Sequence, residues 1–170
     1  MIGALLRTPS CGYAACAAPW PAVVDYGQHL RRRWIDASFD RQYGTDTQGI
    51  IDDMNELGVF TAHRPNAQGY EGIQIPVFRK MLRELNLDPA EYAFVDFGSG
   101  KGRALMMAAE HGFARAYGVE FSPVLHEIAQ KNVAIFGRRS PRACPIELHC
   151  QDASEFSIPD ENIVCFFYNP

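Results

Sequence analysis

The sequence predicts an α/β protein with a doubly wound parallel sheet, preceded by a helical segment. From residue 92 onward, short apolar runs alternate with amphipathic helical patterns, which is typical of parallel strands joined by crossover helices. A glycine-rich run directly follows the first apolar stretch, at the carboxyl end where sheets of this kind bind ligands. The last stretch, Ile163–Tyr168, is apolar throughout, as expected for a strand that is covered on both faces.

Four strands and two helices are expected in this part of the chain. The strands are predicted at residues 92–97, 114–121, 146–150 and 163–168. The first helix is predicted at Arg103–His111, where Gly112 ends it. Ser122 and Pro123 open the second helix, because serine can accept hydrogen bonds from free N–H groups and proline suits the first helical position.

The composition divides the chain into three parts. Residues 1–24 are rich in Ala, Pro and Cys and lack the basic start and apolar core of a signal peptide, so they are interpreted as a poorly ordered extension. Residues 25–91 are polar and rich in turn residues and are expected to form short helices and loops. One helix near residues 75–85 is indicated by apolar residues at i, i+3, i+4 and i+7. Residues 92–170 make up the ligand-binding domain.

Composition and charge weigh against several classes of protein. A net charge of −4 with 47% apolar residues fits a soluble globular protein without the basic surplus of a nucleic-acid-binding protein. No apolar run approaches the roughly 20 residues of a membrane helix. The five cysteines and five histidines show no metal-ligand spacing. Unpaired thiols indicate a cytoplasmic protein, and Cys150 and Cys165, in apolar strands, are expected to be buried.

The central motif is D-F-G-S-G-K-G at residues 96–102. Glycines at alternate positions let the backbone lie directly against a ligand, because no Cβ intervenes. A P-loop is excluded, since Val95 and Gly102 stand where its first glycine and its Ser/Thr are required. The dinucleotide fingerprint fits badly, because Arg103 occupies the position of its third glycine and Asp96 would repel a pyrophosphate. A ligand with positively charged groups suits this turn better.

Three acidic residues are expected around the glycine-rich turn. Glu120 ends the second strand, 22 positions after Gly98, where a carboxylate can accept hydrogen bonds from ribose hydroxyls. Asp152 follows the third strand, where it can accept a hydrogen bond from an adenine amino group. Asp96 precedes the first glycine by two positions. Three acids at strand ends around one turn indicate a nucleoside-binding site.

These motifs resemble those of class I S-adenosylmethionine-dependent methyltransferases. D-F-G-S-G-K-G and G-V-E-F-S-P look like the cofactor motifs of that family, and both are also similar to the Dot1-type lysine methyltransferases. The resemblance extends over residues 38–170 and implies a bacterial branch with a Rossmann-like sheet and S-adenosylmethionine as cofactor. The site residues that it implies fall into three groups: Asp96, Gly98, Ser99 and Gly100 at the methionine moiety; Glu120 at the ribose; and Phe121, Asp152 and Ala153 at the adenine.

The resemblance also implies residues outside the cofactor motifs. Asn169 falls where this superfamily often places a residue that faces the substrate, and an Asn there can orient an amine lone pair. Tyr43, Asp46 and Thr47 are expected to form a lid over the cofactor. No metal is implied. The methyl acceptor stays open between a small molecule and a protein.

The chain departs from the resemblance at its C-terminus. The family's sheet normally has seven strands, and only four are predicted here, so the chain is interpreted as C-terminally truncated. The fourth strand, Ile163–Tyr168, is then expected to be an exposed edge that self-associates. Two alternatives to a methyltransferase remain open: a non-catalytic fragment that binds a cofactor or a partner, and a nicotinamide-dependent oxidoreductase.

Overall fold

The computed structural model describes residues 2–8, 11–16, 26–53, 55–58 and 69–168. Within these ranges the helices are α1 (Tyr26–Tyr43), α2 (Ile75–Glu84), α3 (Arg103–His111) and α4 (Pro123–Arg139), with short 3-10 turns η2 (Pro89–Glu91) and η3 (Ala153–Glu155). The strands are β1 (Ile2–Thr8), β2 (Cys11–Cys16), β3 (Ile50–Ile51), β4 (Tyr70–Glu71), β5 (Ala93–Phe97), β6 (Arg115–Glu120), β7 (Ile146–Cys150) and β8 (Ile163–Tyr168).

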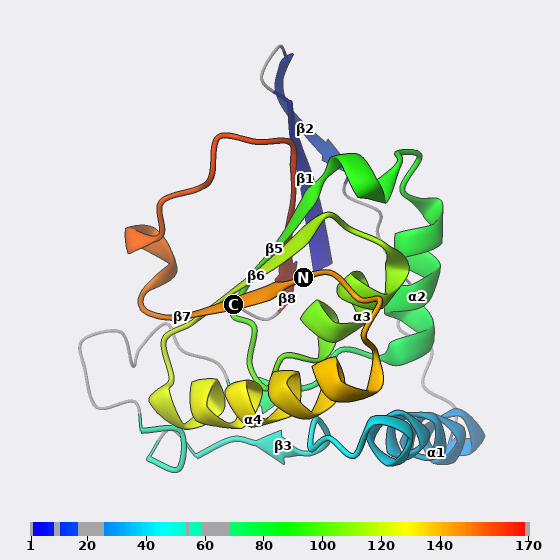
Figure 1. Cartoon of the computed structure of the whole chain (residues 1–170). Helices are drawn as coiled ribbons and strands as arrows, with labels where there is room; N and C mark the ends of the chain where they lie inside the picture. The colour runs from blue at the N-terminus through cyan, green and yellow to red at the C-terminus, as the bar shows by residue number, and fades with distance from the viewer. Residues whose placement is uncertain (1, 9–10, 17–25, 54, 59–68, 169–170) are drawn as a thin grey trace.

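The main sheet has six strands in the order β2-β1-β8-β5-β6-β7 (Figure 1). The four strands expected from the sequence, β5 to β8, are all present and pair in parallel. The Rossmann-like fold class is therefore confirmed. The parallel core reads β8-β5-β6-β7, so the chain changes direction across the sheet beside β5. That switch point lies next to the glycine-rich turn, which follows β5 directly.

The N-terminal hairpin corrects two expectations from the sequence. Strand β1 pairs antiparallel with β8 from Ile2 opposite Tyr168 to Arg7 opposite Ile163, and β2 pairs with β1. The interpretation of residues 1–24 as a poorly ordered extension is therefore wrong for residues 2–8 and 11–16. The expected exposed edge at β8 is wrong too, because β1 supplies its second row of backbone partners. The expected self-association through β8 loses its basis.

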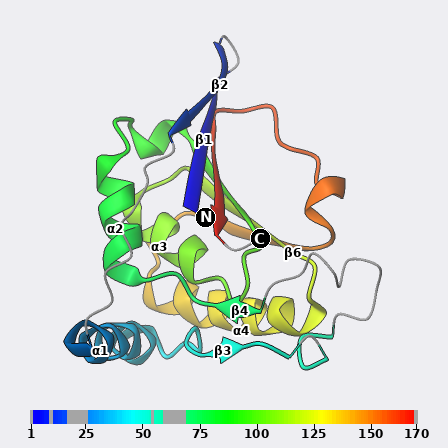
Figure 2. The ribbon, with the colours of Figure 1, turned by 180° about the vertical axis from the view of Figure 1, so that it is seen from behind.

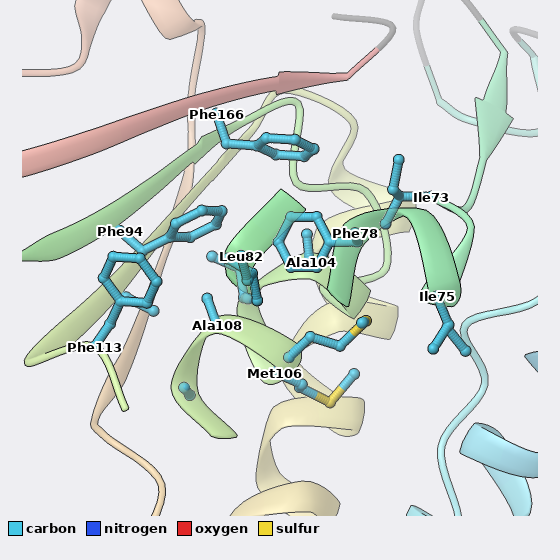
Figure 3. Close-up of a cluster of buried hydrophobic side chains, with 14 of the residues drawn as sticks. Ile73, Ile75, Phe78, Leu82, Phe94, Ala104, Met106, Ala108, Phe113 and Phe166 are labelled. Carbon is cyan, nitrogen blue, oxygen red and sulfur yellow. The ribbon is translucent and has the colours of Figure 1, made fainter. Parts of the chain in front are cut away.

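The main core lies between the sheet and helices α2, α3 and α4. Phe78 of α2 packs edge-on against Phe94 of β5 and Phe166 of β8, with ring centroids 5.8 and 5.0 Å apart (Figure 3). The same cluster contains Ala104 and Met106 of α3. Helix α2 contributes because its apolar residues recur on one face, which the sequence pattern predicted.

The other face of the sheet is covered without an α-helix in the described residues. Phe156, in the connection between β7 and β8, packs against Phe97, and Phe97 stacks on Phe167 with ring centroids 4.8 Å apart. The hydroxyl of Tyr117 donates to Glu161 in the same connection. This connection with its single 3-10 turn η3 stands where a doubly wound fold normally has a crossover helix.

The segment before the sheet is more regular than its composition indicated. Short helices and loops were expected, but α1 is one helix of 18 residues, which runs beside the C-terminal end of α4 in both views (Figures 1 and 2). The helix ends predicted within the α/β part are confirmed: Gly112 adopts a left-handed φ of 108° after α3, and Ser122 Oγ accepts from Leu125 N at the start of α4.

Two expectations from composition can also be compared with the structure. None of the helices in the described ranges is long and apolar enough to cross a membrane. Cys165 is buried in β8 as expected, whereas Cys150 is exposed. The latter expectation is wrong because Cys150 is the last residue of β7, the outermost strand at its side of the sheet.

Candidate functional site

The glycine-rich turn between β5 and α3 is held in a conformation that favours glycine. Gly98, Gly100 and Gly102 all have positive φ angles, 82°, 52° and 83°, which side-chain-bearing residues rarely adopt. The amides of Gly98 and Ser99 donate to Val119 O of β6 at 2.9 and 3.1 Å. The turn is therefore tied to the neighbouring strand, and its backbone forms a fixed wall.

Glu120 connects this turn to the start of α4. Its two carboxylate oxygens accept from Gly100 N and Ser122 N, both at 2.8 Å. The side chain is buried, and burial raises the pKa of Glu120, an effect that these backbone hydrogen bonds oppose. A carboxylate fixed by two amides keeps lone pairs directed away from them, which suits it to accept bonds from a pair of hydroxyls.

Asp96 is the second buried carboxyl group of the site. It lies on β5, in register with Gly118 of β6, and is almost inaccessible to solvent. Burial, and after it the charge of Glu120, raise the pKa of Asp96 to about 8. The carboxylate form of Asp96 is thus disfavoured when nothing positive is near, and a cationic ligand group beside it would stabilise that form.

The glycine-rich turn and the two acids line one cavity of about 680 Å³, counted with its open mouth. The cavity brings together six residues that the sequence predicted for the cofactor site: Asp96, Gly98, Ser99, Gly100, Glu120 and Phe121. Ser99 Oγ is buried and has no hydrogen-bond partner among the described residues.

Three predicted site residues are not brought to this cavity. Asp152 lies beyond the end of β7, where its carboxylate caps η3 by accepting from Ser154 N at 2.7 Å and from Ser154 Oγ at 2.6 Å. Ala153 is the exposed first residue of that turn. Neither lines the cavity. Asn169 lies outside the described residues, so its expected place facing the substrate stays a prediction.

The three expected lid residues occupy separate places. Tyr43 is buried between Phe39 and Phe136, with ring centroids 4.9 and 5.0 Å away, and its hydroxyl donates to Glu110. Asp46 forms an ion pair with Lys101 at 3.2 Å. Thr47 is fully buried behind the cavity wall. None of the three lines the cavity.

Several cavity residues were missed by sequence reasoning. They come from two segments of the N-terminal part, from the C-terminal half of β8, from α3, and from α4 with its N-cap: Leu57, Gly69, Tyr70, Glu71, Gly72, Ile73, Arg103, Ala104, Ser122, Leu125, Phe166 and Tyr168. The one available signal was the aromatic residue Tyr70 between two closely spaced glycines, Gly69 and Gly72, which permits close backbone approach. Within the described residues, no group of three or more His, Cys, Asp and Glu is placed to hold a metal ion.

Comparison with known proteins adds family information. Residues 48–143, more than half of the chain, match the family model described as "Histone methylation protein DOT1". Among curated proteins, none matches the chain significantly. The matched range contains the glycine-rich turn, Glu120 and the Tyr70–Ile73 wall of the cavity.

Solved structures resemble parts of this chain at low overall similarity. An RNA methyltransferase from Salinibacter ruber in complex with S-adenosyl-L-homocysteine is 29% identical, with 52% of this chain and 55% of that chain covered and a TM-score of 0.43. An S-adenosylmethionine-dependent methyltransferase from Thiobacillus denitrificans, in the same type of complex, is 17% identical over 62% of this chain and 38% of that chain, with a TM-score of 0.43. A tRNA (m1A58) methyltransferase from Aquifex aeolicus is 13% identical over 92% and 60%, also with a TM-score of 0.43. The chain thus spans less than two thirds of each of these proteins.

Proposed function

The chain belongs to the DOT1 family of histone methylation proteins, and we propose that it binds S-adenosylmethionine in the Asp96–Glu120 cavity and transfers its methyl group to an amine. The observation that carries this proposal is the pair of backbone hydrogen bonds to the carboxylate of Glu120. The amides of Gly100 and Ser122 fix its carboxylate at the cavity wall, where ribose hydroxyls of a nucleoside ligand would find two aligned acceptors.

The remaining wall fits the other parts of this cofactor. Asp96 provides a buried carboxyl group for the ammonium end, and Ser99 Oγ, which is otherwise unpartnered in the described residues, provides a donor and an acceptor. Phe121 and Leu125 give apolar surface on the side of Glu120, where the adenine would lie. A polar adenine contact by Asp152 would require η3 to move toward the cavity, since its carboxylate now caps that turn.

The chain's own contribution to transfer is mainly binding and alignment. The cofactor supplies a methyl group on a positively charged sulfur, so an unprotonated amine can displace the thioether in line. In such a transfer a C–N bond would form as the C–S bond breaks, with the electron pair kept by sulfur and the amine proton released to solvent. A cavity that holds the sulfonium beside the bound amine would supply proximity, which can account for much of such catalysis.

The acceptor that we propose is a cationic protein side chain. Glu71 lines the cavity. Asp52, Asp53 and Glu56 lie in the neighbouring segment that contributes Leu57 to the lining, and no Lys or Arg occurs from residue 45 to residue 58. Asp52 Oδ1 lies against Gly69 at the cavity, 2.8 Å from where a Cβ would stand. An acidic border attracts a basic peptide and repels a nucleic-acid backbone. A cytoplasmic location is also proposed, on the free cysteines Cys144, Cys150 and Cys165.

Calorimetry with S-adenosylhomocysteine tests the cofactor part of the proposal. We expect S-adenosylhomocysteine to bind to the purified chain and NAD not to bind. In Glu120→Ala the affinity for S-adenosylhomocysteine should fall about tenfold or more, because removal of one partner leaves buried polar groups unpaired. Glu127→Ala is the matched control, since the Glu127 side chain is exposed, does not line the cavity and pairs with Lys131. Tight binding of NAD without S-adenosylhomocysteine binding would replace this function with the oxidoreductase alternative.

The transfer part needs a separate experiment. The chain is incubated with methyl-labelled S-adenosylmethionine and a lysine-rich peptide, the same peptide with every lysine replaced by glutamine, or an RNA oligonucleotide. We expect label only in the lysine peptide. Binding of S-adenosylhomocysteine without label in any acceptor would favour the non-catalytic alternative, and label in RNA alone would overturn the proposed acceptor.

A further inference from the structure

The end of β8 forms part of the cavity wall, and its partner in the sheet at that end is β1. Phe166 and Tyr168 of β8 line the cavity. The ladder between β5 and β8 ends at the pair formed by Phe97 and Phe167. Tyr168 lies one residue beyond that pair, and the strand residue opposite it is Ile2 of β1. The position of the Tyr168 backbone in the sheet therefore depends on β1.

Phe166, the other cavity residue of β8, is held from further directions. Its ring centroid lies 5.0 Å from that of Phe78 in α2 and 5.7 Å from that of Phe94 in β5. Phe166 is buried, whereas Tyr168 is half-buried. Loss of β1 would thus leave Phe166 packed in the core and would free the cavity wall at Tyr168.

The hairpin of β1 and β2 is joined to the main sheet through β8. Strand β1 pairs with β8 on one side and with β2 on the other, and β2 is the outermost strand. The elements that β1 contacts most extensively are β8 and β2. Both views show the hairpin at one edge of the sheet (Figures 1 and 2). An edge hairpin of this kind can open while the rest of the sheet stays folded, because stability is not uniform across a structure.

We propose that docking of the β1–β2 hairpin on β8 is coupled to occupation of the cavity, so that the hairpin acts as a regulatory element. With the hairpin docked, Tyr168 completes the wall and the ligand is held. With the hairpin released, that part of the wall is lost and the ligand binds more weakly. By linkage, a bound ligand favours the docked hairpin by the same factor. This inference rests on the proposed function, since the ligand is the proposed cofactor.

Amide hydrogen exchange of the unaltered full chain tests the coupling without any substitution. An opening that abolishes ligand binding becomes about 100-fold rarer when free ligand is at about 100 times its dissociation constant. We expect S-adenosylhomocysteine at that concentration to slow exchange of the β1 amides about 10- to 100-fold. The amides of β7 are the matched control, because β7 is the outermost strand at the other edge and none of its residues lines the cavity. Their exchange should change less than about threefold.

Two adjacent aromatic residues of β8 test whether Tyr168 is the link. Tyr168→Ala removes the side chain whose strand partner is in β1, so the ligand should bind more weakly and no longer protect the β1 amides. Phe167→Ala is the matched control, because the Phe167 ring stacks on Phe97 at the other face of the sheet and does not line the cavity. Protection of β1 by the ligand should persist in Phe167→Ala. Each variant is measured at the same multiple of its own dissociation constant.

Leu5→Pro tests the same coupling in the reverse direction. Leu5 lies between β8 and β2, opposite Cys165 and Ala15, and proline removes a backbone donor from this strand. We expect the β1 amides to exchange faster while those of β5 and β6 keep their protection. The affinity for S-adenosylhomocysteine should fall with the docked fraction, about tenfold when about one tenth of the hairpins stay docked. A released hairpin with unchanged affinity would overturn the coupling.

The remaining outcomes separate this inference from the proposed function. If the unaltered chain binds S-adenosylhomocysteine and exchange is slowed equally in β1 and β7, or in neither, the hairpin is a passive cover of the sheet edge and the coupling is overturned. If protection of β1 persists in Tyr168→Ala, the link does not run through Tyr168 and the inference is wrong. If the unaltered chain does not bind S-adenosylhomocysteine, the proposed function fails and this inference fails with it.

Discussion

The edge of the Tyr70 ring lies against Gly100, so close that a Cβ on Gly100 would stand 2.5 Å from Cε2 and 2.8 Å from Cδ2 of the tyrosine. The tyrosine is fixed there by its hydroxyl, which donates to Thr47 O at 2.7 Å. The same carbonyl oxygen accepts from Arg103. The glycine-rich turn is therefore held from two sides, by β6 within the sheet and by Tyr70 from the N-terminal part of the chain.

This contact predicts that Gly100→Ala weakens ligand binding. The substitution introduces a steric overlap with Tyr70 and places alanine at a φ of 52°, which costs about 1 kcal/mol in a non-glycine residue. We expect a lower unfolding temperature and S-adenosylhomocysteine binding weakened at least about tenfold, measured by differential scanning fluorimetry and calorimetry.

The double variant Gly100→Ala/Tyr70→Ala distinguishes the two causes. Removal of the ring relieves the overlap but not the backbone strain, so we expect the double variant to be more stable than the sum of the single changes. If the effects of the two changes on the free energy of unfolding are simply additive, Tyr70 does not restrict residue 100 and their contact makes no measurable contribution to stability.

The raised pKa of Asp96, about 8, makes the stability of the empty protein dependent on pH. The folded state keeps a proton on Asp96 that the unfolded chain releases near pH 4, so stability is full below that pH and falls as pH rises toward 8, by up to about 1.4 kcal/mol per pH unit. Asp96→Asn cannot ionise. We expect chemical denaturation at pH 8.5 to show Asp96→Asn more stable than the unaltered chain, with the difference shrinking toward pH 5. Glu120, whose pKa is also raised, is present in both proteins, so it enters the comparison only through the charge interaction with Asp96 that Asp96→Asn removes. A constant difference across this range would contradict the shift.

The same group predicts the pH dependence of ligand binding. A cationic ligand group beside Asp96 needs the carboxylate form, so binding below pH 8 expels a proton. We expect the affinity for S-adenosylhomocysteine to rise by up to about tenfold per pH unit between pH 6 and pH 8 and then to level off. Calorimetry in buffers of different ionisation enthalpy should report release of one proton at pH 7 in the unaltered chain and none in Asp96→Asn. Equal proton release in both proteins would place the linked group elsewhere.

The sequence predicted the parallel part of the fold because its signals are local. The apolar runs, the helix end at Gly112 and the cap at Ser122 each depend on a few neighbouring residues, and all are confirmed. The methyltransferase resemblance is confirmed at the level of the family. The pairing of β1 with β8 joins residues about 160 positions apart, and no local pattern reports such a contact.

The candidate site, like the fold, could be predicted from the sequence only where its signals are local. The residues on the β5–α3 turn and at the end of β6 meet in one cavity because parallel strands end at the same edge of the sheet. Tyr70 and Arg103 were missed, since their roles arise from hydrogen bonds to Thr47 across a long separation in sequence. The motif at Arg103 was used only to exclude a dinucleotide site, whereas the side chain itself holds the cavity wall.

Deletion of residues 1–16 tests the corrected edge of the sheet. Without β1, the backbone groups of β8 that face it lose their partners, and the apolar residues Ile163, Val164 and Phe166 lose part of their cover. We expect the deletion variant to unfold at a lower denaturant concentration and to show concentration-dependent self-association by light scattering, while the full chain does not. A deletion variant as stable and monomeric as the full chain would show that β1 contributes nothing to covering β8.

The variants Tyr43→Phe and Thr47→Val test whether these two residues close over the ligand as a lid or stabilise the protein from buried positions. Tyr43 packs in the core, and its hydroxyl donates to Glu110, whose side chain is 39% exposed, so water can replace the lost bond. Burial first, and then this bond, raise the pKa of Tyr43 to about 12. We therefore expect Tyr43→Phe to cost about 1 kcal/mol of stability or less and to leave the affinity for S-adenosylhomocysteine unchanged.

Thr47→Val removes the hydroxyl that binds Asp40 and Arg103 in a fully buried place, so it should weaken both stability and ligand affinity. If calorimetry shows that Tyr43→Phe reduces affinity at unchanged stability, Tyr43 closes over the ligand and its place in the core describes only the empty protein.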